Sequence, residues 1–224
     1  MVFLNNLESS YDVLIVGAGI AGTEAALACA KAGLDTLLVT TLLDSSYALF
    51  SDSVLLKAPK DTLMSGAIIS VGDKKPTRSR DLHRAAKYAL EHTPNLHCLQ
   101  SSVSALIVEA DTVLGVDTWE GVSRFAKKTA LCVGSFLEAR LMLGTLLEKA
   151  GRLSEMAYDD LYNDLCAKGF RFKPLELEAK DVHPTYKVSF KMFDQEFDSQ
   201  TFASIRLKNL YAAGLCAFGS LSYE

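Results

Sequence analysis

A short aliphatic run near the start of the chain leads into a glycine-rich turn and then into a helical pattern. Residues 12–16 (DVLIV) are almost entirely apolar, which is typical of a strand buried on both faces of a parallel sheet. Small side chains recur at helical spacing over residues 20–32, and Gly33 lies where a helix would end. Residues 35–40 (DTLLVT) indicate a second buried strand. These segments predict a βαβ unit.

The periodicity is lost after the second strand and then returns. Residues 41–80 are rich in Ser, Asp, Lys and Pro, so we expect a long excursion over the surface there. Residues 80–92 recover a helical pattern. Three strand-like runs then follow, at 103–108, 113–119 and 125–133. Because short turn signals separate them, they predict an antiparallel meander.

The remaining segments predict a smaller mixed portion. Residues 158–167 indicate a helix, residues 187–192 alternate as a half-exposed strand does, and residues 210–213 indicate a final strand. We expect residues 150–208 to form a small α+β portion of one domain that spans residues 1–224. The fold class that follows is α/β, Rossmann-like and three-layered, with a central parallel sheet and an antiparallel β-meander.

Composition narrows the classes of protein. The chain has 224 residues and a formal net charge of -4, which disfavours nucleic-acid binding by an overall positive field. No apolar run approaches the roughly 18 residues that a membrane span needs, and residues 1–10 lack the pattern of a secretion signal. The five cysteines are scattered, with no CxxC pair and no histidine at metal-ligand spacing. We therefore expect a soluble, cytoplasmic protein with reduced thiols and no metal site.

The glycine-rich turn carries the clearest chemical signal. In a GxGxxG turn between a strand and a helix, the first glycine permits the tight bend, the second lets a diphosphate approach the backbone, and the third lets the helix pack on the sheet. The helix N-terminus then presents free N–H groups to the two phosphates. The alternative is a tight turn that binds nothing. The residues of the turn are Gly17, Ala18, Gly19, Ile20, Ala21 and Gly22.

The position that usually contacts a ribose departs from the common pattern. An Asp or Glu normally ends the second strand, about 20 residues beyond the glycines. This chain has Thr40 and Thr41 there. Their hydroxyls can bond a ribose, and Asp44 is a possible substitute from the following loop. Adenosine recognition is the least defined part of the predicted site.

The segments after the βαβ unit favour FAD over NAD as the dinucleotide. The predicted meander ends at Gly134, and a strand–glycine segment follows at residues 211–214. Three separated turns that meet one extended cofactor are the layout of FAD-binding Rossmann-like folds, whereas an NAD enzyme more commonly continues as a second βαβαβ half. An NAD-linked dehydrogenase is thus the weaker alternative.

These residues also resemble a known family, the glucose-inhibited division protein A (GidA) flavoproteins that modify the wobble uridine of tRNA. The resemblance rests on residues 12–26, which include Gly-Thr-Glu-Ala-Ala, on residues 84–100, and on residues 133–137 with Gly-Ser-Phe-Leu. Ala213-Gly214 and Ser222-Tyr223-Glu224 are similar to the family's last flavin motif. Full-length members carry further domains that engage tRNA and a GTPase, so the chain is most similar to the small GidA-related proteins.

The resemblance implies a set of cofactor contacts. Gly17 to Gly22 would hold the pyrophosphate, Thr40 and Thr41 would lie at the ribose, and the Val103 backbone would meet the adenine. The other implied contacts are Val133, Gly134 and Ser135 in the turn beside the cofactor and Gly214 and Leu215 at the flavin end. Arg140 is a candidate for contacting cofactor or substrate, although an ion pair with Glu138 or another neighbour is its simplest role.

Catalytic residues are not evident from the sequence. Cys216, two residues beyond Gly214, is a weak candidate for a redox thiol near the flavin. Two functions remain open. One is an FAD-dependent oxidoreductase related to tRNA modification, with NADH or NADPH as a possible reductant. The other is an accessory FAD-binding module that acts by docking to a protein partner.

Overall fold

The computed structural model describes residues 10–50, 52–55, 57–71, 75–179 and 183–219. Within them a seven-stranded sheet has the order β5-β2-β1-β8-β7-β6, and β15 pairs with β8 beside this path. Its strands are β1 (Tyr11–Val16), β2 (Thr36–Thr40), β5 (Leu96–Gln100), β6 (Val103–Glu109), β7 (Thr112–Thr118), β8 (Ser123–Leu131) and β15 (Leu210–Ala212). The predicted α/β class, with a parallel sheet and an antiparallel meander, is confirmed.

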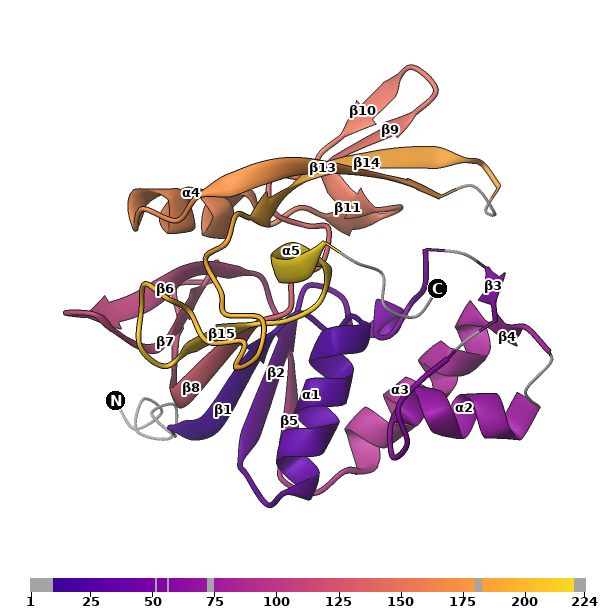
Figure 1. Ribbon diagram of the computed structural model, residues 1–224, viewed down its shortest axis with the longest axis horizontal. Helices are drawn as coiled ribbons and strands as arrows, with labels where there is room; N and C mark the ends of the chain where they lie inside the picture. Colours follow the sequence, from indigo (N-terminus) through magenta and orange to yellow (C-terminus); the bar gives the residue numbers. More distant parts are fainter. Residues whose placement is uncertain (1–9, 51, 56, 72–74, 180–182, 220–224) are drawn as a thin grey trace.

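The first strand is apolar on both faces because helices cover both sides of the sheet. Val13 and Ile15 pack against α1 (Ile20–Lys31), and Leu14 and Val16 belong to the cluster that contains α4 (Asp159–Ala167). The predicted helix at 80–92 is α3 (Ser79–His92), which lies beside α1 (Figure 1). Strands β1 and β2 pair parallel with α1 between them, so the βαβ prediction for residues 12–40 is correct.

Strand β8 is shared between two partners on one side. Its first residues pair antiparallel with β7, where Phe125 lies opposite Gly115. Its last residues pair parallel with β15, where Leu131 lies opposite Ala212. The other side of β8 pairs with β1 along its length. This division brings the ends of β1, β8 and β15 to one edge of the sheet, although their sequences are far apart.

The excursion at residues 41–80 holds more structure than its composition indicated. It contains the 3-10 turn η1 (Leu43–Ser45), the two-stranded pair β3 (Ser53–Val54) and β4 (Thr77–Arg78), and helix α2 (Leu63–Val71). Helix α2 packs on α3. The interpretation of this segment as irregular surface chain was therefore incomplete.

A second, four-stranded sheet has the order β10-β9-β14-β13 and lies above the central sheet in Figure 1. Its strands are β9 (Arg140–Leu143), β10 (Leu146–Glu148), β13 (Phe172–Ala179) and β14 (Tyr186–Phe193), and the hairpin of β11 (Ala150–Arg152) and β12 (Glu155–Met156) adjoins it. Because β9 starts at Arg140, the smaller portion begins earlier than the expected residue 150. Leu141, Val188 and Phe190 form its core with Leu215 of α5 (Leu215–Phe218).

One buried carboxylate holds in place the segment that follows β14. Glu196 is fully buried and accepts hydrogen bonds from Arg171 Nε at 3.0 Å and from Arg206 Nε at 3.1 Å. The Arg171 backbone N–H also donates to it at 3.0 Å. Among the described residues, no helix is both long and apolar enough to span a bilayer.

Candidate functional site

The backbone geometry of the turn after β1 explains why two of its positions are glycine. Gly17 has φ of +100°, a backbone conformation that favours glycine, and its N–H donates to the Val39 carbonyl at 2.7 Å. A Cβ at Gly17 would lie 2.4 Å from the Cys132 carbonyl oxygen. A Cβ at Gly22 would lie 1.8 Å from the Gly17 carbonyl oxygen. Both glycines are therefore needed for backbone packing.

Gly19 differs from its two neighbours because nothing lies within 4 Å of the position of its Cβ. It caps α1, no side chain caps the helix there, and the Thr23 N–H makes the first bond back to the Gly19 carbonyl at 2.9 Å. The N–H groups of Ile20, Ala21 and Gly22 precede that bond and have no partner within the helix. Open space thus adjoins a set of free donors at the positive end of α1.

A cavity of about 930 Å³, including its open mouth, lies over this turn. Three turns meet at it, after β1, β8 and β15. The lining residues are Gly17, Ala18, Gly19, Ile20, Ala21, Thr40, Thr41, Ser45, Ala48, Phe50, Cys132, Val133, Gly134, Ser135, Phe136, Arg152, Glu155, Tyr158, Ala213, Gly214 and Leu215.

One wall of the cavity is residues 43–50, which we call the roof loop. The Tyr47 N–H donates to the Ala18 carbonyl at 2.8 Å, so the roof loop is bonded to the glycine turn itself. The buried Tyr47 hydroxyl donates to the Glu24 carboxylate on α1. Glu24 also accepts from the N–H groups of Leu63 at 3.2 Å and Met64 at 3.1 Å, at the start of α2.

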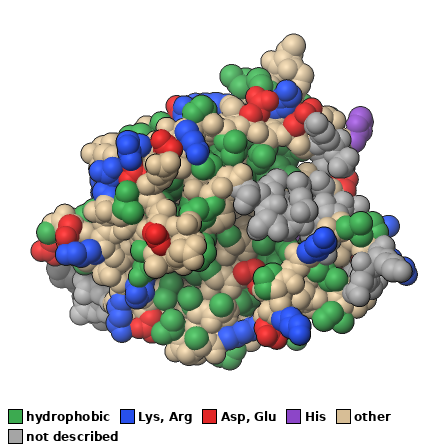
Figure 2. Space-filling model, viewed as in Figure 1, with side chains coloured by type: hydrophobic (Ala, Val, Ile, Leu, Met, Phe, Trp, Pro, Cys, Tyr) green, Lys and Arg blue, Asp and Glu red, His purple; other side chains and the backbone are tan. Residues whose placement is uncertain are grey.

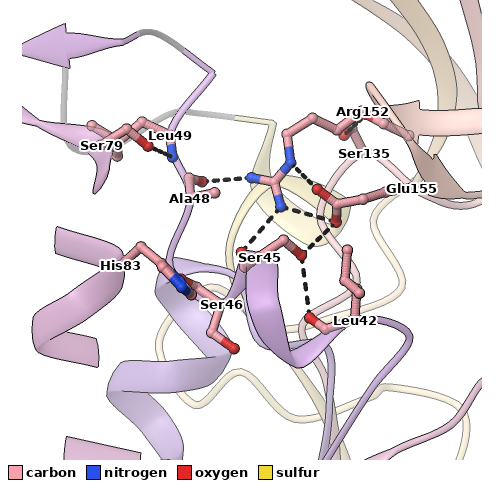
Figure 3. A network of polar contacts seen from close by, with 11 residues as sticks. Leu42, Ser45, Ser46, Ala48, Leu49, Ser79, His83, Ser135, Arg152 and Glu155 are labelled. Carbon is pink, nitrogen blue, oxygen red and sulfur yellow. Dashed lines mark hydrogen bonds and ion pairs between the residues drawn. The ribbon is translucent and has the colours of Figure 1, made fainter. Parts of the chain in front are cut away.

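The hairpin β11–β12 also holds the roof loop through hydrogen bonds, as Figure 3 shows. Arg152 donates to the Ala48 carbonyl at 2.7 Å and to the Ser45 carbonyl at 3.3 Å. It also pairs with Glu155 through two bonds, Nε to Oε1 at 2.5 Å and Nη2 to Oε2 at 3.0 Å. The Ser45 hydroxyl donates to Glu155 Oε2 at 2.9 Å. The small sheet and the excursion therefore close the cavity together.

The turn after β8 supports this hairpin. The buried Ser135 hydroxyl donates to the Gly151 carbonyl at 2.9 Å. A Cβ at Gly151 would lie 2.3 Å from the Phe136 ring, so the hairpin packs directly on that ring. The Tyr158 N–H donates to the Phe136 carbonyl at 2.8 Å. The Gly-Ser-Phe segment singled out in the sequence thus positions a wall of the cavity.

Tyr158 supplies a buried polar atom at the same wall. The residue is 3% exposed, and its hydroxyl has no hydrogen-bond partner of good geometry among the described residues. Burial raises the pKa of Tyr158 to about 12, although Thr41 lies close enough to lower it, and Glu155 adds to the increase. The hydroxyl is therefore a neutral donor that lies beside Thr41 and makes no hydrogen bond of good geometry to a described residue.

The structure brings together most of the residues that the sequence nominated. Apart from Gly22, the lining includes the nominated residues of all three turns, together with Thr40, which ends β2, and Thr41, which follows it. Gly22 lies beneath Gly17 and outside the lining. Val103 is buried in β6, also outside the lining. These positions describe the cavity, while contact with a cofactor stays a prediction.

The other nominated side chains lie away from the cavity lining. Arg140 Nη1 donates to Asp159 Oδ1 at 3.0 Å, so it pairs with a neighbour other than Glu138. Asp44 pairs with Lys87 at 2.5 Å and is 73% exposed. Ser222-Tyr223-Glu224, part of the last nominated motif, lies outside the described residues.

Cys216 does not line the cavity. Its side chain is completely buried, and its Sγ approaches the carbonyls of Leu131 and Ala213 at 3.5 Å. Burial raises the pKa of the Cys216 thiol to about 11. Its surroundings do not favour the thiolate that a nucleophile needs.

Sequence reasoning missed the polar wall formed by Ser45, Arg152, Glu155 and Tyr158. These residues carry no motif of their own, and they meet only because the hairpin folds back onto the excursion. The spacing Arg152-x-x-Glu155 was visible, but a pair three residues apart is common on any surface. No group of His, Cys, Asp and Glu that could hold a metal occurs within the described residues.

The comparisons with known proteins agree with this geometry. The crystal structure of the GidA-related protein from Thermus thermophilus matches with a TM-score of 0.84 and 42% identity, over 93% of this chain and 90% of that chain. The structure of Aquifex aeolicus GidA in the form II crystal matches with a TM-score of 0.68 over 75% of this chain and 32% of that chain; at 23% identity it supports the fold alone.

A curated relative is the tRNA uridine 5-carboxymethylaminomethyl modification enzyme MnmG of Chlamydia muridarum, 26% identical over 231 residues. The match covers 92% of this chain but only 38% of that enzyme. The family model described as "Glucose inhibited division protein A" matches residues 12–64 and 73–179, which is well over half of the chain. The chain belongs to the glucose inhibited division protein A family.

Proposed function

We propose that this protein binds FAD in the cavity above the glycine turn. The observation that carries the proposal is the open space at Gly19, next to the free N–H groups of α1. A diphosphate fits that space chemically, because its charge is stabilised by the helix N-terminus. The residues present therefore suit the group.

The rest of the cavity suits the two ends of the same dinucleotide. Thr40 ends β2 and Thr41 follows it, at the place where a ribose lies in Rossmann-like folds. At the other end, Phe50, Gly214 and Leu215 offer an apolar wall for an isoalloxazine ring. FAD, when bound, supplies electron or hydride transfer, and the protein supplies binding, orientation and exclusion of water.

We further propose that the bound flavin serves an oxidoreductase related to tRNA uridine modification. Support comes from the curated relatives, whose names state that activity. Figure 2 shows Lys and Arg interspersed with Asp and Glu on the face it displays. With a net charge of -4, the chain would need a partner or a local contact to hold tRNA. All five cysteines are free, which fits the reducing cytoplasm in which we place the protein.

A specific observation also favours an accessory FAD-binding module. Among the lining residues, Arg152 and Glu155 are occupied with each other, and Tyr158 holds its proton strongly. Burial also raises the pKa of the lining thiol of Cys132. The lining thus offers no side chain poised near neutral pH to act as acid, base or nucleophile.

The binding proposal is tested by a matched pair of glycine variants. Gly19→Val fills the open space at the helix N-terminus and should abolish flavin retention. Gly66→Val is the control, since Gly66 is exposed on α2 and also has nothing within 4 Å of its Cβ position. The released cofactor is identified by chromatography and absorbance. A Gly19→Val protein with normal FAD content, or a wild-type protein that takes up no FAD, contradicts the proposal.

Enzyme and module are separated by reduction of the bound flavin. Anaerobic bleaching of the flavin absorbance by NADH or NADPH, on the timescale of turnover and dependent on or accelerated by tRNA, is expected of the oxidoreductase. An FAD-loaded protein that neither nucleotide reduces, with or without tRNA, favours the module.

A further inference from the structure

The ribose position of this cavity lacks the carboxylate that usually ends β2. Thr40 and Thr41 stand there, and the neighbouring Asp44 pairs with Lys87 at the surface. A ribose bound at this place would thus contact the hydroxyls of Thr40 and Thr41 and would find no carboxylate at the end of β2. A carboxylate from another part of the chain lies in the same cavity.

Glu155 lines the same cavity and is 8% exposed. Its Oε2 atom accepts from Arg152 and from Ser45, whereas Oε1 accepts one bond, from Arg152 Nε. A carboxylate oxygen accepts two hydrogen bonds, so Oε1 keeps one acceptor site. The two hydrogen bonds from Arg152 fix the carboxylate in orientation.

A second, independent observation points to a ligand at this wall. The Tyr158 hydroxyl is buried and without a well-placed partner, and it lies beside Thr41. An unpaired buried hydroxyl costs free energy unless a ligand or water satisfies it. A diol presents both donors and acceptors, which match the acceptor on Glu155 and the donor on Tyr158.

We propose that Glu155 and Tyr158 form the ribose-recognition subsite of this cavity, replacing the acidic residue that is absent from the end of β2. The inference rests on the proposed function, because it concerns the adenosine ribose of the same FAD. It assigns ribose recognition to the hairpin side of the cavity. The hairpin is therefore a part of the cofactor site as well as its cover.

The test compares two ligands in four proteins. FAD and its analogue with a 2′,3′-dideoxyadenosine moiety are titrated into apoprotein, and dissociation constants are read from flavin fluorescence. A hydrogen bond to a charged group is worth at least about tenfold in affinity, so the wild-type protein should prefer FAD by roughly 10-fold or more. The preference should fall at least threefold in Glu155→Gln and in Tyr158→Phe.

Asp44→Asn is the matched control, because it removes the loop carboxylate that the sequence nominated; its preference should equal that of the wild-type protein. Tyr158→Phe keeps the ring that packs on Phe136, so it reports on the subsite even if Glu155→Gln, which leaves Arg152 unpaired, fails to fold. Variants that weaken both ligands equally, or leave the preference unchanged, overturn the inference while FAD binding stands. A wild-type protein that takes up no FAD overturns the proposed function and this inference with it.

Discussion

The carboxylate of Glu24 accepts a hydrogen bond from the buried hydroxyl of Tyr47, and so joins α1 to the roof loop of the cavity. The same carboxylate caps the first amides of α2. One side chain of the Gly-Thr-Glu-Ala-Ala run thereby fixes two parts of the excursion against the helix that begins at the glycine turn. The family resemblance singled out this glutamate, and the structure gives it a physical role.

Removing either partner of this contact should lower the stability of the protein. Tyr47→Phe leaves Glu24 with its α2 contacts and should reduce the free energy of unfolding by about 1.5–3 kcal/mol. Glu24→Ala should cost more, because the Tyr47 hydroxyl and two amides then lose their partner. Urea titration followed by Trp119 fluorescence and circular dichroism measures both. Equal stability of Glu24→Ala and the wild-type protein would argue against the tether.

Substitutions at Gly22 and Gly19 of the glycine turn should have different effects on stability. Gly22→Ala places a methyl group against the Gly17 carbonyl, and the required backbone shift should cost about 1–3 kcal/mol. Gly19→Ala meets open space, so its stability in the absence of cofactor should lie within about 0.5 kcal/mol of wild type. Chemical denaturation of the two apoproteins provides the comparison. Similar losses in both variants would contradict this assignment of packing and binding roles.

The buried carboxylate of Glu196 gives the stability a dependence on pH. Burial acts to raise its pKa, but hydrogen bonds from Arg206 and Arg171 outweigh it, so the pKa lies below the usual 4.5. A carboxyl group with a lowered pKa in the folded state stabilises that state above its unfolded pKa. The contribution is then lost as the pH falls through the folded value.

Glu196→Gln should therefore lower the free energy of unfolding at pH 7 by about 3 kcal/mol and flatten its decline below about pH 4.5. Urea midpoints measured from pH 3 to pH 7 test both effects. Glu176→Gln is the control, since Glu176 forms a half-exposed pair with Lys187 at 3.3 Å. A Glu196→Gln protein with the wild-type acid profile would be inconsistent with the role given to this group.

The cysteine thiols should differ in reactivity according to their burial. Cys98 and Cys166 are exposed, whereas Cys132 and Cys216 are buried, and burial raises the pKa of both buried thiols. Burial of the sulfur also raises the pKa of Cys98. A maleimide or iodoacetamide at pH 7.5 should therefore modify Cys166 first and Cys98 after it. Cys132 and Cys216 should react only when the protein unfolds. Peptide mass mapping over time gives the order in which the cysteines are modified. Early labelling of Cys216 would contradict this prediction and support a reactive role for its thiol.

The sequence predicted the strands that carry strong patterns and missed several whose patterns are short or mixed, among them the edge strands β5 and β13. Residues 12–16 are buried on both faces, so their apolar run was unambiguous. Strand β5 (Leu96–Gln100) is half-exposed, and its sequence LHCLQ mixes polar and apolar side chains. Strand β13 contains Pro174, which argues against an interior strand but is tolerated at the edge that β13 occupies. Local pattern fails where tertiary position decides the environment.

The difference between local and long-range patterns also explains which parts of the site the sequence predicted. The glycine turn is local, so spacing sufficed to find it. The wall formed by Ser45, Glu155 and Tyr158 is not, because Ser45 and Glu155 are 110 positions apart and meet through one hydrogen bond. Helix α2 was missed for another reason. Its sequence LMSGAIISV is apolar on nearly every side and shows no helical period.

The pairing of β15 with β8 has a consequence for the order of events during synthesis. An emerging polypeptide would complete the βαβ unit and the meander early, yet the third turn of the cavity, at residues 213–215, joins only after more than seventy further residues have been made. A flavin bound as proposed would then find its full set of contacts only after β15 has paired with β8. Cofactor loading would accordingly depend on the segment that joins the cavity last, and a bound flavin would stabilise that pairing.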